Sequence, residues 1–344
     1  MKPITTSLGS HYLTLEEFDA HPAKTEGRIL GAVAFGATQP NLPSLGCPLA
    51  YVNMPPVTGG TAVEVWTSDK PVIRDDDEDI AASRSDDFLF GCLTVEEDGA
   101  IDSISYAVYC RIFDFLESRD YPHLLRIWNY FPRINEDADG LERYRGFSMG
   151  RHDAFADKSP DTQTENAPAA CALGSKDGPI VIYFLAAKNP GQPVENPRQT
   201  SAYHYPAQYG PRSPTFSRAM VARGAKESLL FISGTASIVG HASVHIGNVS
   251  AQTRETITNL RTLIDQAPLI NGASAANDTR LLLKAYLREP EYLPIVQEQL
   301  RMTFGPTMQV IYLQADICRS DLLLEVEGVC INSLQGKSLK GNPW

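Results

Sequence analysis

The sequence predicts an α+β protein made of two related halves, with mixed β-sheets and with helices packed on one face. Segments rich in β-forming residues, such as 61–66, recur along the chain. Helical stripes of apolar residues lie between them, at 104–116 and 250–265. The order of strand, hairpin partner, helix and strand occurs at 88–131 and again at 228–287, which suggests an internal repeat.

In the first half, the first fifty residues have weak periodicity and many prolines and glycines, so we expect irregular structure there. Strands are expected at 61–66, 88–95 and 124–131. The helix at 104–116 has Asp102 or Ser103 in position to cap it. The acidic run at 74–79 predicts a solvated loop rather than a metal site, because consecutive carboxylates point in different directions.

A polar stretch with two prolines, at 157–170, predicts a linker or long loop between two domains, 1–156 and 171–344. The apolar strand at 179–187 is expected to be covered on both faces. The proline-rich loop at 188–214 is long enough to indicate a functional segment. The other predicted elements are a strand pair or a bent strand at 228–239, a helix at 250–265 capped by Ser250, a strand or short helix at 278–287, a helix from 294 to 301 and strands at 307–313 and 322–331.

Composition limits the class of function. The 344 residues carry a formal net charge of -11, which disfavours nucleic acid and anionic membranes as partners. No apolar run is long enough to span a bilayer, and Met1 to Ser10 shows no signal peptide. The six cysteines are scattered, so we expect reduced thiols in a cytoplasmic protein. His241 and His245 have helical metal-ligand spacing, but their Ser-, Val- and Gly-rich surroundings disfavour a metal site.

Three groups of residues are candidates for chemistry. Four arginines in glycine- and tyrosine-rich loops suit carboxylate binding or form surface ion pairs: Arg145, Arg151, Arg212 and Arg218. Four tyrosines near them line a pocket or pack a proline-rich loop: Tyr144, Tyr203, Tyr205 and Tyr209. Glu325 and Glu327 lie two apart in an apolar strand and so share a face, which is either exposed or buried for a purpose.

The second half resembles the RidA/YjgF domain in three segments, FISGTASI (231–238), QTRETITNLRTL (252–263) and EVEGV (325–329). The full length resembles the chorismatase family, which joins a RidA-like C-terminal domain to a related N-terminal half. Six segments carry this closer resemblance: WNYFPRI (128–134), YRGFSMGR (144–151), YHYP (203–206), GPRSPTFSRA (210–219), SGTASI (233–238) and CRSDLLLE (318–325). The sequence most resembles the members that make hydroxybenzoates, including one that releases both 3- and 4-hydroxybenzoate for pigment and quinone pathways.

The resemblance implies an enzyme that cleaves the enolpyruvyl ether of chorismate, releasing pyruvate, with no metal or organic cofactor. It implies that Glu325 protonates the enol methylene, with Glu327 as the fallback or as a like-charge neighbour that tunes it. Cys318 would face the pocket and influence the product, without acting as a nucleophile. The implied substrate contacts are Tyr144, Arg151, Tyr203, Tyr205, Arg212, Thr215, Gly234 and Ala236.

Three alternatives stay open at this stage. One is a chorismate hydrolase that yields a non-aromatic diol and pyruvate, since the residue at the Ala236 position separates the two outcomes within the family. Another is a RidA-type imine deaminase with its site between the two halves. The third is a module that binds an aromatic acid without turnover. The long loop at 188–214 favours the chorismatase, because short RidA domains lack it. The sequence leaves the oligomeric state open, with a monomer among the options.

Overall fold

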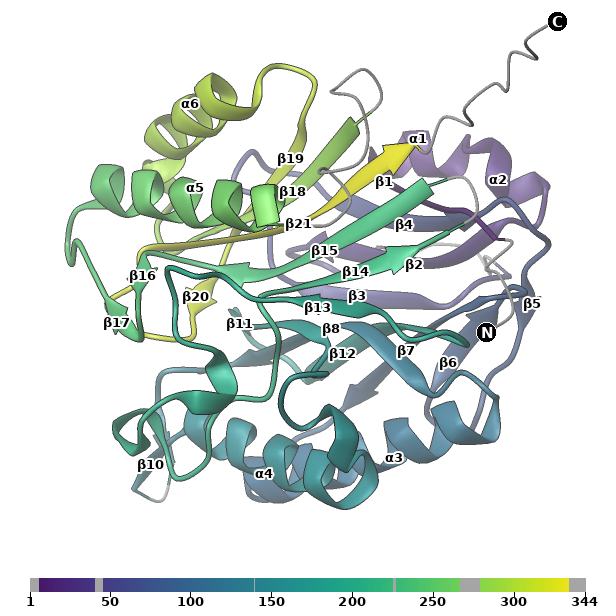
Figure 1. Ribbon diagram of the computed structural model, residues 1–344. Coiled ribbons are helices and arrows are strands. Elements are labelled where there is room, and N and C mark those ends of the chain that lie inside the picture. Colours follow the sequence, from purple (N-terminus) through teal and green to yellow (C-terminus); the bar gives the residue numbers. More distant parts are fainter. Residues whose placement is uncertain (1–5, 41–45, 139, 225–226, 267–278, 334–344) are drawn as a thin grey trace, which may run out of the picture.

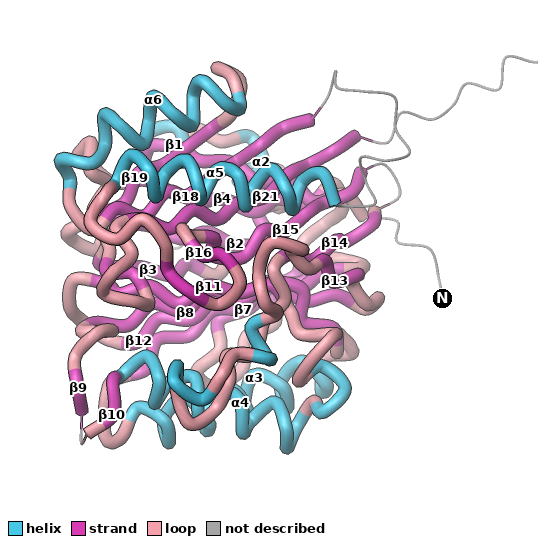
Figure 2. The backbone as a smooth tube through the Cα atoms, turned by 60° about the vertical axis from the view of Figure 1, so that its left-hand side comes forward, coloured by secondary structure: helices cyan, strands magenta, loops and turns pink. Residues whose placement is uncertain are grey.

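The computed structural model describes residues 6–40, 46–138, 140–224, 227–266 and 279–333. Two large sheets face each other across a shared core, and each carries a pair of helices on its outer face (Figures 1 and 2). A smaller third sheet closes one side of the core. The predicted α+β class with mixed sheets and helices packed on one face is therefore confirmed.

The seven-stranded sheet belongs mainly to the first half of the chain. Its order is β20 (Asp316–Ile317), β11 (Ala169–Ser175), β8 (His123–Pro132), β12 (Ile180–Ala187), β7 (Phe88–Val95), β6 (Ala81–Arg84) and β5 (Ile73–Arg74). Helices α3 (Ile101–Ser118) and α4 (Arg143–Lys158) cover its outer face. The apolar stripe of α3 packs there on strand side chains such as Ile127 and Phe184.

The six-stranded sheet is built by the second half. Its order is β13 (Gln192–Val194), β14 (Ala219–Arg223), β15 (Glu227–Thr235), β21 (Leu324–Ser333), β18 (Thr279–Leu287) and β19 (Gln309–Gln314). Helices α5 (Val249–Gln266) and α6 (Leu293–Phe304) cover its outer face. Successive residues of β21 alternate between the two faces, so Val326 packs toward these helices while Glu325 and Glu327 face the shared core.

The first fifty residues are not irregular, and that expectation was wrong. They form β1 (Leu8–Thr14), β2 (Ile29–Gly36) and β3 (Leu49–Asn53), which join β4 (Ala62–Ser68) in a sheet of order β1-β4-β2-β3. The short helices α1 (Leu15–Asp19) and α2 (Pro22–Thr25) pack on its outer face. Every residue of β2 is buried, so this strand shows no alternation of apolar and polar residues in the sequence.

The expectation of a loop at the segment with Arg145 and Arg151 was also wrong, because this segment forms helix α4. Its two glycines are poor helix formers, but Gly150 allows a close approach. A Cβ at that position would overlap the backbone oxygen of Asp102, so the glycine allows α4 to pack directly against α3. Tertiary packing therefore outweighs local propensity in this segment.

Two predicted helix caps were wrong. Helix α3 begins after Ala100 without a side-chain cap, rather than at Asp102 or Ser103. At the start of α5, Asn248 Oδ1 accepts a hydrogen bond from the amide of Ala251 at 3.0 Å, so Asn248 and not Ser250 serves as the cap. The remaining predicted strands and helices are present, and within the described residues 279–287 is a strand.

The domain division stays a prediction, although the sheets qualify it. Strands β11 and β12, which follow the predicted linker, pair with β8 and β7 of the first half. The chain passes from one large sheet to the other between β12 and β13, and β20 later returns to the first sheet. The two halves are thus joined by shared strands, rather than linked by a tether alone.

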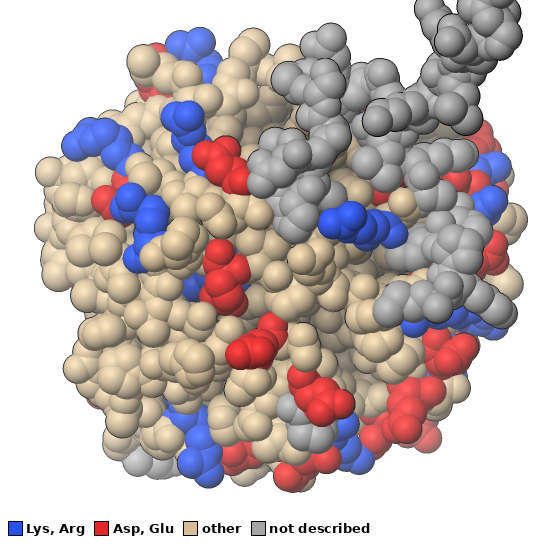
Figure 3. All heavy atoms as spheres, viewed as in Figure 1, with Lys and Arg blue, Asp and Glu red and all other residues tan. Residues whose placement is uncertain are grey.

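The surface agrees with the acidic composition. On the face in Figure 3, acidic side chains gather over the lower right, near β5, β6 and α3. The run at 74–79 lies at the surface as expected, and its carboxylates form ion pairs with Arg74, Arg84, Arg111 and Arg119. The described residues contain no group of three or more His, Cys, Asp or Glu side chains arranged to hold a metal ion. Within the same residues, no helix has the length and apolar character needed to cross a membrane.

Candidate active site

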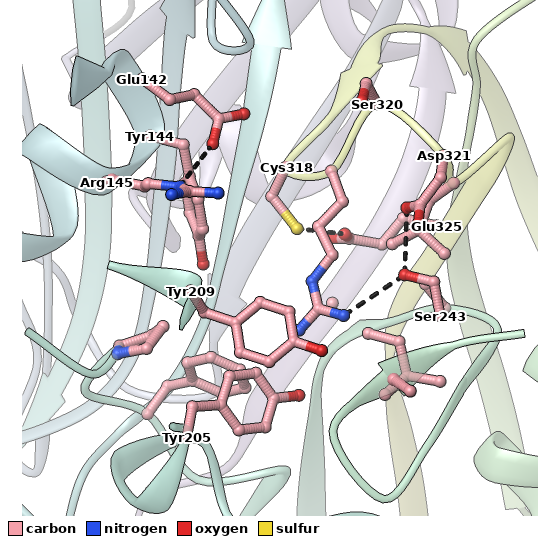
Figure 4. Close-up of a pocket in the computed structure, with 18 of the residues that line it drawn as sticks. Glu142, Tyr144, Arg145, Tyr205, Tyr209, Ser243, Cys318, Ser320, Asp321 and Glu325 are labelled. Carbon is pink, nitrogen blue, oxygen red and sulfur yellow. Dashed lines mark hydrogen bonds and ion pairs between the residues drawn. The ribbon is translucent and has the colours of Figure 1, made fainter. Parts of the chain in front are cut away.

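A cavity of about 410 Å³ opens at the end of the shared core, where both large sheets contribute loops. Strand β21 supplies Glu325, which lies beside Cys318 in the pocket (Figure 4). The end of β15 supplies Gly234, and the bend that follows supplies Ala236. The rest of the wall comes from the start of α4, the proline-rich loop, the small hairpin of β16 (Ile238–Val239) and β17 (Ala242–Ser243), and residues 318–322. Both halves of the chain therefore build the pocket.

Glu325 is a buried carboxyl with few polar neighbours. It is 4% exposed, and among the described residues the one hydrogen bond to its side chain comes from Cys318 Sγ, at 4.0 Å from Oε2. Burial raises the pKa of Glu325 from 4.5 to about 8, against the opposing charges of Arg126 and Arg218. The group is therefore protonated at neutral pH and faces the cavity, which is the state a general acid requires.

Glu327, two residues along the same face, has a different environment. It forms ion pairs with Arg126 and with Lys284, the latter at 2.9 Å. It also accepts hydrogen bonds from Trp128 Nε1 at 3.0 Å and from Tyr286 Oη at 2.6 Å. With four partners in the core between the sheets, two of them cations, Glu327 is a structural group and lies outside the cavity wall. Burial rather than its charge accounts for the raised pKa of Glu325.

Three arginines line the cavity: Arg145, Arg218 and Arg319. Arg218 is buried, and its Nη2 donates to the backbone oxygen of Thr200 and to Tyr205 Oη, both at 2.7 Å. Its Nε has no hydrogen-bond partner among the described residues. Arg319 lies over the ring of Tyr209, at 4.1 Å from the ring centroid. These cations give an acidic protein a local site for an anion.

Arg151 lies at the inner end, where a smaller cavity of about 40 Å³ adjoins the first. Glu325, Tyr144 and Cys318 line both cavities. Arg151 is 5% exposed and lies over the rings of Tyr109 and Phe155. Its Nε and Nη2 have no hydrogen-bond partner within the described part of the chain, so a buried cation with free donors lines the same small cavity as Glu325.

The structure brings most of the expected site residues together, but not all. Six of them line the main cavity: Tyr144, Tyr205, Gly234, Ala236, Cys318 and Glu325. Arg212 does not, because it is about half exposed and pairs with Asp153 at 3.0 Å on the outer surface of α4. Tyr203 does not line the main cavity either, and its ring meets that of His204 edge to face in the proline-rich loop. Thr215 is buried beside the cavity wall rather than in it, between the lining residues Pro214 and Phe216.

Close packing explains the glycine at 234. A Cβ there would overlap Glu325 Oε1 and would lie 3.3 Å from Cys171 Cβ. Gly234 thus lets the carboxyl rest directly against the backbone of β15. Ala236 follows in the same bend, with its small side chain in the cavity wall.

Several lining residues were given too little weight or were missed. Arg145, Arg218 and Tyr209 were candidates but ranked below Arg151, Arg212 and the other tyrosines. The residues missed altogether include Ser243, Arg319 and Asp321. Arg319 and Asp321 lie one and three residues after Cys318, in the segment CRSDLLLE. Their closeness to a candidate site residue could have indicated them from the sequence.

Comparison with known proteins gives consistent matches. A family model described as "Chorismatase FkbO/Hyg5-like, N-terminal" matches residues 64–186. A Streptomyces hygroscopicus protein named 3-hydroxybenzoate synthase is 37% identical over 312 residues, which cover 88% of this chain and 91% of the relative. A protein of Streptomyces rapamycinicus named chorismatase is 35% identical over 95% of this chain and 99% of its own. A chorismatase crystal structure matches 94% of this chain and 98% of its own, with 33% identity and a TM-score of 0.84.

Proposed function

The chain belongs to the chorismatase family, and on this premise we propose that it cleaves chorismate into pyruvate and a hydroxybenzoate. The observation that carries the proposal is Glu325, a buried carboxylic acid that is neutral at pH 7 and open to a cavity with arginines at both ends. Chorismate has two carboxylates and an acid-labile enol ether. The pocket therefore offers a cation for each carboxylate and a proton for the ether.

The two carboxylates need partners about a ring apart. Arg151 has free donors at the inner end, while Arg218 and Arg319 lie toward the mouth. A substrate whose carboxylates bind these arginines would have its ring beside Ala236 and Gly234. The aromatic rings of Tyr144 and Tyr205 would pack against it. Pre-placed arginines reduce the entropic cost of reaching the reactive geometry, which supports catalysis as well as binding.

Glu325 begins the chemistry by giving its proton to the terminal methylene of the enol ether. The ether carbon becomes an oxocarbenium-like centre, and the bond from the ether oxygen to the ring breaks as pyruvate forms. The neighbouring ring hydroxyl closes onto the ring as an arene oxide, which then opens, and loss of a ring proton makes the ring aromatic. Pyruvate and hydroxybenzoate together contain the atoms of chorismate, so the ring proton restores Glu325 and no water is consumed.

The product assigned first is 3-hydroxybenzoate, because the relative with 37% identity carries that name. Release of 4-hydroxybenzoate as well, and use of these acids for pigments or quinones, extends the same proposal. We place the reaction in the cytoplasm, since all six cysteines are free thiols, as a reducing compartment would keep them. Chorismate is the one partner assigned.

The test is to incubate the purified protein with chorismate and separate the products by chromatography. We expect pyruvate and 3-hydroxybenzoate in equal amounts, and a loss of about 100-fold or more in the Glu325→Gln variant, as expected on removing a general acid. A non-aromatic diol with pyruvate would assign the protein to the hydrolysing members instead. Unchanged chorismate would overturn the proposal, and imine substrates would be tested next.

A further inference from the structure

The segment of residues 316–322, here called the site segment, is held by side chains that lie outside the cavity. It begins with β20 and contributes five consecutive residues, 318–322, to the cavity wall. The segment has little regular structure, so its carbonyl groups have few partners in strands or helices. Side chains from other parts of the fold provide those partners.

Arg288, the residue after β18, provides most of them. Its Nε donates to the backbone oxygen of Leu322 at 3.0 Å, and its Nη2 donates to those of Ile317 at 3.3 Å and Arg319 at 3.1 Å. Nη1 pairs with Asp316 at 2.6 Å. One planar guanidinium thus holds both ends and the middle of the site segment, which the single ammonium of a lysine cannot reproduce.

Gln252 holds the site segment from the opposite side. It lies in the first turn of α5 and is fully buried. Its Nε2 donates to the backbone oxygen of Asp321 at 2.9 Å, and its Oε1 accepts from the amide of Leu323 at 2.8 Å. A glutamine this deeply buried, with both polar ends bonded to one loop, fixes that loop relative to α5.

The site segment in turn places three groups of the cavity. Cys318 Sγ approaches Glu325 Oε2 at 4.0 Å. Arg319 donates to the backbone oxygen of His241 at 2.9 Å, in addition to its contact with Tyr209. Asp321 accepts a hydrogen bond from Ser243 Oγ at 3.0 Å. A shift of the segment would therefore move a cation, a thiol and the small hairpin together.

We propose that Arg288 is a positioning residue for the cleavage reaction, with Gln252 as its counterpart. It sets where Arg319 and Cys318 stand against the substrate ring, and thereby sets the ratio of products. This inference rests on the proposed function, since it names residues that support the same site. Arg288 itself is absent from the wall of the cavity that contains Glu325, so it acts through the site segment and not on the substrate.

The experiment compares Arg288→Met, Arg288→Lys and Gln252→Met with a matched control, Arg119→Met. Arg119 is a partly buried arginine that pairs with Asp75 on the other side of the seven-stranded sheet. We expect Arg288→Met to lose about 10- to 100-fold in kcat/KM, as displacement of a binding group by an ångström does, and to change the ratio of aromatic products to diol. Arg288→Lys should recover stability but not the product ratio. Arg119→Met should keep kcat and KM each within about twofold of the wild type.

Two further measurements keep the test decisive if a variant is unstable. Guanidinium ion at millimolar concentration should restore activity to Arg288→Ala, and it should leave Arg119→Ala unchanged. Crystal structures of the wild type and of Arg288→Met should show the site segment displaced. Unchanged kinetics and products in Arg288→Met, or a site segment that stays in place, would overturn the inference. If the wild type does not cleave chorismate, the proposed function fails, and the crystal comparison still decides the role of Arg288.

Discussion

Two glutamates on one face of β21 show how position alone gives the same side chain opposite roles. Glu325 and Glu327 are both buried, at 4% and 0% exposure. Glu325 has a thiol as its neighbour and opens to a cavity, whereas Glu327 has two cations and two further donors. The first environment favours the neutral acid and the second favours the carboxylate.

The difference teaches that burial is compatible with either protonation state. The protonation state of a buried carboxyl depends on whether the surrounding strands bring cations and hydrogen-bond donors to it. At Glu327 the opposite sheet provides Arg126 and Trp128 from β8, and β18 provides Lys284. At Glu325 the corresponding space is the cavity, so the desolvated carboxyl keeps its proton and can give it to a substrate.

The largest expected effect is on stability. Glu327→Gln leaves Arg126 and Lys284 with one carboxylate fewer between them, and we expect a loss of about 3–5 kcal/mol in the free energy of unfolding. Glu325→Gln replaces a neutral acid by a neutral amide of the same shape and should show no such loss at pH 6, where the unfolded wild type has already released the proton that the folded protein keeps.

Urea denaturation of both variants and the wild type at pH 6 measures this contrast. Equal losses in the two variants would show that the two environments do not differ in how they stabilise a carboxylate. The comparison between the two environments would then be wrong.

The second prediction concerns pH. Catalysis needs protonated Glu325, so kcat/KM should be level below about pH 8 and should fall tenfold for each unit above it. Stability follows the same group. Because burial raises the pKa of Glu325 above its ordinary 4.5, the folded state holds a proton that the unfolded state has released between pH 4.5 and about 8. The associated stability is fully present below pH 4.5 and is lost as the pH rises to about 8.

Glu325→Gln removes this dependence. The variant should therefore gain stability relative to the wild type as the pH rises across that window, and the gain should level off above it. Denaturation curves at several pH values test the prediction. A difference that does not vary with pH would mean that Glu325 titrates in the folded protein as it does in the unfolded chain.

The contrast between the two glutamates was only partly accessible from sequence. Their spacing in an apolar strand predicts that they share a face, and the structure confirms it. The choice between them rested on resemblance to the family, because the partners of Glu327 are remote. Arg126 lies 201 residues earlier in the chain, and no local pattern connects the two.

The same reason explains the misplaced site residues. Arg151 and Arg212 come from segments that look alike in sequence, yet Arg151 points inward from α4 while Arg212 pairs with Asp153 outside. Helical periodicity would separate inward from outward positions, but α4 carries few apolar residues and was taken as loop. Strongly patterned elements such as β7, β8 and α5 were predicted well, because their periodicity is set by the faces they bury.

The third prediction alters the packing of Glu325 and leaves its identity unchanged. Gly234→Ala places a Cβ where Glu325 Oε1 now rests, so the carboxyl must move. We expect kcat to fall about tenfold, since a displaced acid misses the methylene, with a smaller change in KM. Steady-state kinetics with chorismate measures both values.

Gly36→Ala is the matched control for this change. Gly36 is the last residue of β2, in the third sheet and away from the cavity. Its new Cβ would lie 3.0 Å from Thr61 Oγ1. Activity in this control should be unchanged. Full activity in Gly234→Ala would show that the position of the Glu325 carboxyl is not critical.

The smallest effect concerns Cys318, the one neighbour that donates a hydrogen bond to Glu325 among the described residues. A thiol is a weak donor, and burial raises the pKa of Cys318, so it stays protonated and unreactive. Cys318→Ser puts a stronger donor at the same place. Hydrogen bonding to the charged form of Glu325 then lowers its pKa, and the alkaline limb of kcat/KM should move down by less than about one unit.

Cys318→Ala lacks any donor and should show no such downward shift, with activity at pH 7 within about threefold of the wild type. The pair of variants separates two roles, because a nucleophilic cysteine would be lost in both while a hydrogen-bond donor is strengthened in one and removed in the other. Inactivity in both variants would mean that Cys318 takes part covalently. A limb that moves only in the serine variant would place Cys318 beside the acid, as a group that adjusts its proton affinity without reacting.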